Sequence, residues 1–354
     1  MRRINLDQIQ AGAILAKSIM TLEGKVLLTS GIELNEEYVK RLQLNGITEV
    51  FIEDKISRDI HVPDFIREEI ITEAKQLVKN MMVSTSIKTS IDGQKVMEVV
   101  DKIISSILAN GDIIVNLSDI RSVDDYTFSH SVNVCIYSLV IGIGLGYSGD
   151  KLRELGVGSM LHDIGKVRIP QQILKKPGRL TPDEFEEIKR HTYYGYKILK
   201  ETNGISMTAS FIALGHHERS DGSGYPYRLK NDNIHKAARI VAVSDVYDAL
   251  TSDRVYRKKL MHHEVIDYIT SLASRHFDHE IVNTFIRYVA YYPVGTAVIL
   301  NTGEKGLVSK YNKYFPTRPV VRIVMDEEGK MLTRHKEVDL NEKLEYRIVK
   351  IWDI

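Results

Sequence analysis

Seven histidine and aspartate side chains, spread over about a third of the chain, restrict how these 354 residues can fold. Burying two such polar groups side by side is costly unless something polar receives both. Imidazole and carboxylate are also ligand types that first-row divalent metals accept. We therefore expect the fold to bring them into one metal pocket. In chain order they are His130, His162-Asp163, His191, His216-His217 and Asp245.

Seven ligands are more than one ion can use, and they suit two ions that share a bridging carboxylate. Such a pair produces hydroxide at neutral pH and stabilises both oxygens of a displacement at phosphorus. Asp163 is the candidate bridge, and Lys166, one turn later, is placed to offer an ammonium to a phosphate oxygen. A lone histidine on a helix is more often a packed side chain than a ligand. That interpretation weakens as further ligands occur on successive helices.

Composition sets broad limits on the class of protein. A hydrophobic content of 43% and a charged content of 27% are typical of a soluble globular chain. The net charge of +1 gives no sign of a nucleic-acid polymer or an anionic membrane as partner. Cys135 is the single cysteine and lies in an apolar run, so we expect a buried inert thiol and a reducing compartment.

Nothing in the sequence indicates export or membrane insertion. The first residues lack the apolar core of a signal peptide. The most apolar stretch, residues 132–147, is shorter than the roughly 20 residues that cross a bilayer, and it contains Asn133 and three glycines. We expect a buried helix without a membrane span, and a cytoplasmic protein.

The length favours two or three domains, and the patterns divide the chain into four regions. The expected fold is multidomain and mainly α. An all-helical catalytic domain is flanked by a small α+β N-terminal module and a small β-rich C-terminal domain. Residues 63–117 form a helical linker that either pairs with a second subunit as a homodimer or packs within its own chain. The expected ranges are 1–62, 63–117, 118–290 and 291–354.

Local signals place several elements. Asn35 is a plausible N-cap for a helix over 36–44, and strands are expected at 13–18, 25–28 and 49–52. Helices are expected from Pro63 and over 96–109. Thr181-Pro182-Asp183-Glu184 should start a helix that continues to Leu199 and points His191 into the protein. After Pro293, apolar residues recur at every second position, which is the pattern of β-strands. It indicates a small barrel-like domain with strands at 298–300, 306–308, 319–325 and 344–351.

The ordered ligands, together with the Gly224-Tyr225-Pro226 loop, resemble the HD-GYP branch of the HD phosphohydrolase superfamily. Residues 216–226 are similar to its signature loop and residues 244–250 to its late helix, and the resemblance spans about residues 119–290. It implies an all-helical domain with two or three ions, usually iron or manganese. It also implies a bacterial signalling enzyme that hydrolyses cyclic di-GMP to linear pGpG, GMP or both.

The resemblance also implies a role for each matching residue. One ion would be held by His130, His162, Asp163 and Asp245, and the second by His191, His216 and His217, with Asp163 as bridge. Lys166 would stabilise charge on the scissile phosphate. Gly224, Tyr225 and Pro226 would shape the substrate loop, and Arg254 and Arg257 would contact the substrate.

One position departs from part of that family. Members with a third ion carry glutamate four residues before the first histidine, where this chain has Tyr126. A neutral phenol is a poor ligand for a hard cation. We therefore predict two divalent ions per chain. Two alternatives stay open, namely a hydrolase of another cyclic dinucleotide or nucleotide phosphate, and a receptor that binds a cyclic dinucleotide without cleaving it.

Overall fold

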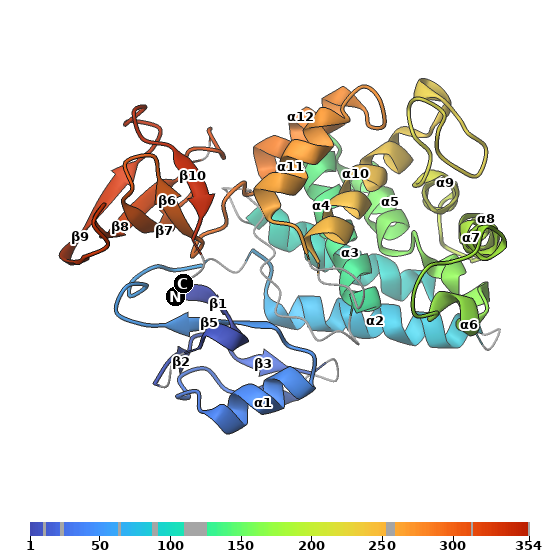
Figure 1. Ribbon diagram of the computed structural model, residues 1–354. Coiled ribbons are helices and arrows are strands. Elements are labelled where there is room, and N and C mark those ends of the chain that lie inside the picture. Colours follow the sequence, from blue (N-terminus) through green and yellow to red (C-terminus); the bar gives the residue numbers. More distant parts are fainter. Residues whose placement is uncertain are drawn as a thin grey trace. The chain divides into compact units, whose positions relative to one another are not determined.

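The computed structural model describes residues 1–9, 12–21, 25–62, 65–86, 91–109, 126–252, 259–312 and 314–352 (Figure 1). The chain forms two compact units. The described residues of the first lie in Met1–Phe65 and Val289–Ile354, and those of the second in Ile66–Ile113 and Tyr126–Tyr288. The four regions expected from the sequence stay a prediction.

The N-terminal half of the first unit combines short strands with one helix. β1 (Arg2–Asn5), β5 (Glu49–Glu53) and β2 (Ile14–Leu15) form an antiparallel sheet in that order, and β3 (Ile19–Met20) pairs with β4 (Val26–Leu28). A short 3-10 helix, η1 (Leu6–Gln8), follows β1. Helix α1 (Glu36–Leu44) has the predicted bounds, because the Asn35 side chain accepts a 2.8 Å hydrogen bond from the Tyr38 N–H and caps its first turn.

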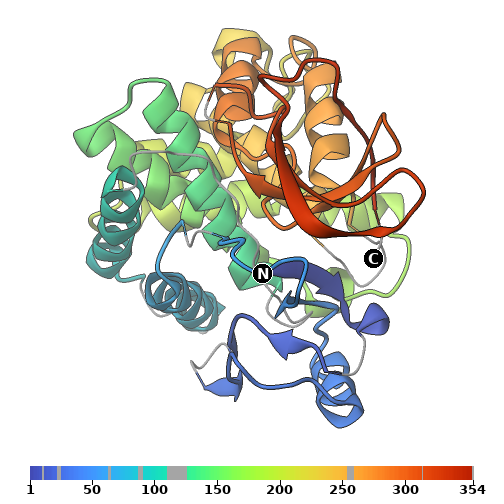
Figure 2. The ribbon, with the colours of Figure 1, turned by 90° about the vertical axis from the view of Figure 1, so that its left-hand side faces the viewer.

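The C-terminal half of the first unit is one antiparallel sheet of five strands, drawn in red in Figures 1 and 2. Four of the strands overlap predicted ones. β9 was missed because its side chains are mostly polar and exposed, without an apolar alternation. No pairing among the described residues joins β9 to β10, so the sheet does not close into a barrel. The order is β10 (Ile348–Ile351), β6 (Ala297–Leu300), β7 (Lys305–Lys310), β8 (Val320–Met325) and β9 (Met331–Asp339).

These two halves share a hydrophobic core. Phe51, Ile60 and Val62 from the N-terminal half are buried in one cluster with Val298 and Leu307 of the sheet. Burial of apolar surface is the main favourable term in folding, so each half stabilises the other. The amino group of Met1 adds hydrogen bonds to the carbonyls of Ser57 and Ile60.

The second unit is helical, and α4 is its central helix. α4 packs against α2, α3, α5, α10 and α12, and α2 lies beside α3 (Figures 1 and 2). Cys135 of α4 is fully buried, as predicted, and burial raises the pKa of its thiol to about 12. The elements of this unit are α2 (Glu68–Ser86), α3 (Gly93–Ala109), α4 (Tyr126–Gly144), α5 (Gly149–Met160), η3 (Ile164–Arg168), α6 (Gln171–Leu174), α7 (Pro182–Lys189), α8 (His191–Lys200), α9 (Met207–Gly215), η4 (Asn231–Asn233), α10 (Lys236–Thr251), α11 (His262–Ser271) and α12 (His279–Tyr288).

Among the described residues, α4 is the one helix long and apolar enough to cross a bilayer. Its window Thr127–Gly144 is 78% buried inside the protein. A core helix of a globular domain passes the same test of length and apolarity, so the burial favours that assignment.

Two helices differ from the prediction. The helix expected from Pro63 begins at Glu68 instead, although Phe65 and Ile66 are buried as their spacing suggested. The helix expected from Thr181 to Leu199 is divided at Arg190 into α7 and α8. There the Nδ1 of His191 lies 2.7 Å from the carbonyl oxygen of Ile188, and this side-chain contact competes with the helical hydrogen bond to that carbonyl.

Candidate metal centre

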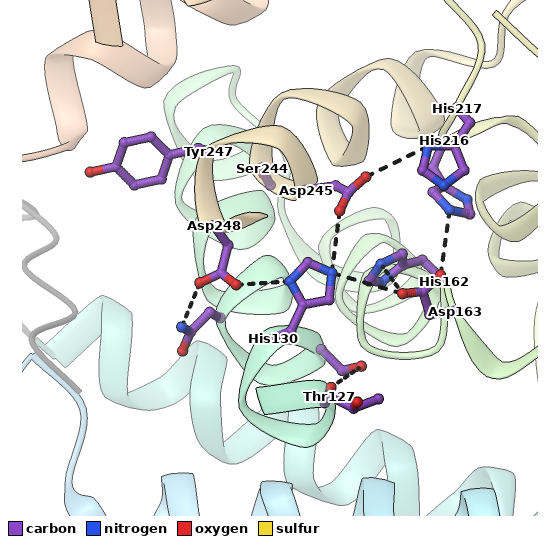
Figure 3. Close-up of polar contacts among 12 residues, drawn as sticks. Thr127, His130, His162, Asp163, His216, His217, Ser244, Asp245, Tyr247 and Asp248 are labelled. Carbon is purple, nitrogen blue, oxygen red and sulfur yellow. Dashed lines mark hydrogen bonds and ion pairs between the residues drawn. The ribbon is translucent and has the colours of Figure 1, made fainter. Parts of the chain in front are cut away.

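The fold brings all seven predicted ligands to one place in the second unit, and Figure 3 labels all of them except His191. His130 lies in α4 and Asp245 in α10. His162 and Asp163 occupy the turn between α5 and η3. His191 starts α8, and the pair His216-His217 follows α9. All are buried except His217, which is partly exposed.

The ligand atoms form two groups, and Asp163 lies between them. The first group is His130, His162 and Asp245, and the second is Asp163, His191, His216 and His217. One oxygen of Asp163, Oδ2, lies 3.3 Å from His162 Nε2 and 3.8 Å from His130 Nε2. The other, Oδ1, lies 3.3 Å from His191 Nε2 and 3.8 Å from His216 Nε2. Each oxygen of one carboxylate therefore faces a different group.

Three of the histidines are oriented by backbone carbonyls. The Nδ1 of His162 is 2.8 Å from the Ser159 oxygen, that of His191 is 2.7 Å from Ile188, and that of His216 is 3.0 Å from Ala213. An Nδ1–H that donates to a carbonyl leaves Nε2 unprotonated and free to bind a cation. These contacts thus leave the Nε2 atoms of all three rings available to a cation.

His130 is oriented differently, by a carboxylate that the sequence analysis did not assign. Its Nδ1 lies 2.8 Å from Asp248 Oδ2, while its Nε2 lies 3.2 Å from Asp245 Oδ1 (Figure 3). The other oxygen of Asp248 accepts a 2.7 Å hydrogen bond from the Asn133 amide. The available signal was the spacing, since Asp248 follows Asp245 by one helical turn and Asn133 follows His130 by one turn.

Replacing Asp248 by asparagine should weaken metal binding in the first group. Asparagine offers one acceptor oxygen where Asp248 uses two, and it removes the negative charge that supports His130. Loss of such a supporting carboxylate typically lowers metal affinity about 10- to 100-fold. Metal titration followed by elemental analysis would measure this, with S244A as control, because Ser244 makes a buried 3.0 Å hydrogen bond to Ser138 on the same two helices. Two ions bound by D248N as tightly as by the wild type would contradict the prediction.

The charge states of the site suit a cation. Burial alone would raise the pKa of Asp163, but the charge of Lys166 holds it well below its usual range. Burial lowers the pKa of His191 to about 4 and that of His216 to about 3, so both rings are neutral. Burial would also lower the pKa of His130, but hydrogen bonds to Asp245 and Asp248 raise it to about 9. An ion bound there would displace a proton from His130.

Among the residues that the structure describes, two buried atoms of the candidate ligands have no hydrogen-bond partner, namely His162 Nε2 and Asp163 Oδ1. Such atoms are rare in folded proteins and call for an explanation, of which a bound ion is one. Imidazole nitrogens and carboxylate oxygens in these numbers fit a divalent first-row metal. Lys166 contacts the same cluster, with its Nζ 2.5 Å from Asp163 Oδ2.

The loop that contains Gly224, Tyr225 and Pro226 lies against the second group. The Tyr225 ring is 4.7 Å from the His217 ring, and its N–H donates to the His217 carbonyl at 3.2 Å. A Cβ on Gly224 would overlap the backbone of residues 217–219, so only glycine fits this approach.

A buried glutamate that the sequence analysis did not single out anchors this loop. The two oxygens of Glu218 accept hydrogen bonds from the N–H groups of Tyr227 and Leu229, at 2.7 and 3.0 Å. Arg254 and Arg257, the predicted substrate contacts, lie outside the described residues.

Comparisons with known proteins agree with the predicted family. Residues 120–281 match the family model of the HD domain, and residues 297–354 match that of a KOW domain associated with the HD domain. A cyclic di-GMP phosphodiesterase of Pseudomonas aeruginosa is 35% identical over 271 residues, which cover 77% of this chain and 65% of that protein. A cyclic di-GMP phosphodiesterase of Thermotoga maritima is 41% identical over 172 residues, which cover 48% of this chain and 46% of that protein.

The chain therefore spans less than two thirds of the length of these relatives. Among solved structures, an HDG"Y"P protein from Bdellovibrio bacteriovorus matches 80% of this chain and 97% of its own, with a TM-score of 0.50 and 15% identity. At that identity the match concerns the fold alone.

Proposed function

Because this chain belongs to the HD domain family through residues 120–281 and resembles the HD-GYP branch, we propose that it is a metal-dependent phosphodiesterase that hydrolyses cyclic di-GMP to linear pGpG, GMP or both. The observation that carries the proposal is the pair of ligand groups that face opposite oxygens of Asp163. The named activity of the Pseudomonas and Thermotoga relatives supports the choice of substrate.

The proposed cofactor is a pair of divalent ions, iron or manganese. Such ions act as Lewis acids toward phosphate oxygens and lower the pKa of water. His130, His162 and Asp245 would hold one of them and His191, His216 and His217 the other, with Asp163 as bridge. The number two rests on Tyr126, whose side chain lies outside the described part of the structure.

The proposed catalytic contribution of the chain itself is electrostatic. The Lys166 ammonium, already beside Asp163, is placed to stabilise charge that develops on the scissile phosphate. Buried walls around the ligands lower the local dielectric and strengthen that interaction. The Tyr225 ring, packed against His217, would define one side of the substrate pocket.

The remaining proposals concern organisation. We take residues 1–62 as an α+β module, 63–117 as a helical linker, 118–290 as the catalytic region and 291–354 as a β-rich domain. A homodimer through residues 63–117 and a location in the cytoplasm are proposed on the sequence patterns alone. No nucleic-acid polymer or membrane lipid is proposed as a partner, since the net charge is +1.

The test is chromatography of cyclic di-GMP after incubation with anaerobically purified, metal-analysed protein. We expect conversion to pGpG or GMP that depends on iron or manganese and stops when a chelator removes the metal. A parallel incubation with 3′3′-cGAMP tests the alternative substrate class. Binding of cyclic di-GMP without any product, at full metal occupancy, would refute the proposed activity and favour a receptor.

A further inference from the structure

Arg219 is a cation beside the metal centre to which neither the sequence analysis nor the proposed function gives a role. It follows the ligand His217 by two residues, and its backbone is part of the substrate loop. The Arg219 carbonyl accepts a 2.8 Å hydrogen bond from the Gly222 N–H. Its backbone nitrogen would lie only 2.4 Å from a Cβ on Gly224, so the two residues are in close contact. Any ligand that this loop contacts therefore lies near Arg219.

The guanidinium of Arg219 is held in place but not neutralised. It lies over the Phe277 ring, 5.2 Å from the ring centroid, and its Nη1 donates to the Glu218 carbonyl at 3.3 Å. In the part of the chain that the structure describes, these two contacts involve no carboxylate, and Arg219 forms no ion pair. A guanidinium has five N–H donors, so most of its hydrogen-bonding capacity remains for a ligand.

The neighbours of Arg219 place it on the side of the ligand groups. Its backbone nitrogen borders Gly224, and the next residue of that loop, Tyr225, donates its N–H to the carbonyl of the ligand candidate His217. The Tyr225 ring also packs against the ring of His217, which belongs to the second ligand group. Taking a cation partly out of water without a counter-ion is costly, and an anion bound at this face would remove the cost.

The charge balance favours such an anion once the proposed ions are bound. Two divalent ions would outweigh the carboxylates of Asp163 and Asp245. The site would then carry an excess of positive charge next to the planar guanidinium of Arg219 and its N–H donors. Guanidinium groups bind phosphate oxygens through two parallel hydrogen bonds, which a lysine cannot reproduce.

We propose that Arg219 binds a non-bridging phosphate oxygen of the cyclic dinucleotide and is a substrate-binding residue of this site. The inference rests on the proposed function for the identity of the substrate, but it requires only a phosphate anion. Arg219 acts from the loop that carries Gly224 and Tyr225. Lys166 belongs to a different element, η3, and its Nζ lies beside Asp163.

The test compares the full-length wild type with R219M and R219K after loading with Mn²⁺. The readouts are the bound manganese, the affinity for inorganic phosphate, and KM and kcat for cyclic di-GMP. We expect R219M to weaken phosphate binding and to raise KM about 10- to 100-fold, with unchanged manganese content. R219K should recover part of the loss. R275M is the matched control, because Arg275 is an exposed cation that faces Asp221 at 3.8 Å.

Each outcome decides between binding and a merely structural role. Wild-type phosphate affinity in R219M, or no phosphate binding by the wild type, would overturn the proposal. A parallel loss of manganese and phosphate in both R219M and R219K would instead assign Arg219 to support of the loop. A wild type that binds phosphate through Arg219 but leaves cyclic di-GMP intact would refute the proposed function and leave this inference standing.

Discussion

Replacing Asp163 by asparagine is expected to reduce the proposed hydrolysis of cyclic di-GMP by about 10³-fold or more, because several kcal/mol of transition-state stabilisation would depend on the proposed metal pair. Asparagine keeps the shape of the side chain but removes its charge and one of its two ligand oxygens. In the structure each oxygen faces a different ligand group, and among the described residues Oδ1 accepts no hydrogen bond. Asp245 also approaches both groups, at 3.2 Å from His130 Nε2 and 3.7 Å from His217 Nδ1, but Asp163 lies 3.3 Å from a histidine of each group.

The measurements are turnover by chromatography and bound metal by elemental analysis, with circular dichroism to establish that D163N is folded. Folding should persist, since the Lys166 side chain that loses its partner is partly exposed and its ammonium can be solvated by water. D150N is the matched control, because Asp150 is an exposed carboxylate that pairs with Arg153 at 2.8 Å. Wild-type turnover or a full complement of metal in D163N would show that Asp163 is not the bridge.

Replacing Gly165 by alanine is expected to have the largest effect on stability. Gly165 lies in η3, two residues after Asp163, and its Cα packs directly on α8. A Cβ there would overlap the carbonyl oxygen of His191 and the backbone nitrogen of Gly195, both of which are backbone atoms that cannot rotate away. Overpacking of a well-packed site costs about 1–3 kcal/mol and occasionally more, and we expect the upper end.

For a unit of this size, about 3 kcal/mol corresponds to a fall in Tm of roughly 6–12 °C, which thermal denaturation would measure. Displacement of η3 from α8 in G165A should also separate Asp163 from His191 and weaken metal binding. G215A is the control, because a Cβ at Gly215 would meet only the Ala238 methyl, at an ordinary 3.4 Å. A G165A variant with the Tm of G215A would mean that η3 can withdraw from α8 without cost.

Features that depend on neighbouring residues in the chain could be predicted from the sequence. The capping box of α7 is present as expected, with the Thr181 hydroxyl 3.2 Å from the Glu184 N–H and the Glu184 carboxylate 2.7 Å from the Thr181 N–H. The clustering of the candidate ligands could also be predicted, because His162-Asp163 and His216-His217 stand out as adjacent pairs. Composition and periodicity further indicated a helical region followed by a small sheet domain, in agreement with the HD and KOW matches.

Features that depend on contacts between distant residues could not be predicted. The partner of Asp248 lies 118 residues away in α4, and the spacing from Asp245 indicates a shared helix face without identifying His130 as that partner. The break at Arg190 interrupts an apolar pattern that continues on both sides, and its cause is the contact of His191 with the Ile188 carbonyl. The sequence around Glu218 resembles that of an exposed acidic residue. Its burial depends on the loop that follows it, whose Tyr227 and Leu229 N–H groups donate to the Glu218 carboxylate.

The shared core of the chain's two ends has a consequence for how this protein can be cut. The described residues of the helical unit lie in the sequence between Phe65 and Val289, where the described parts of the first unit end and resume. Deleting the last 60 or so residues would remove the side chains that cover Phe51 and Ile60, and would therefore destabilise the amino-terminal half as well. It also follows that the first unit is covalently joined to the metal-ligand candidates on both sides of them in the sequence, so a structural change in that unit can reach them from either side.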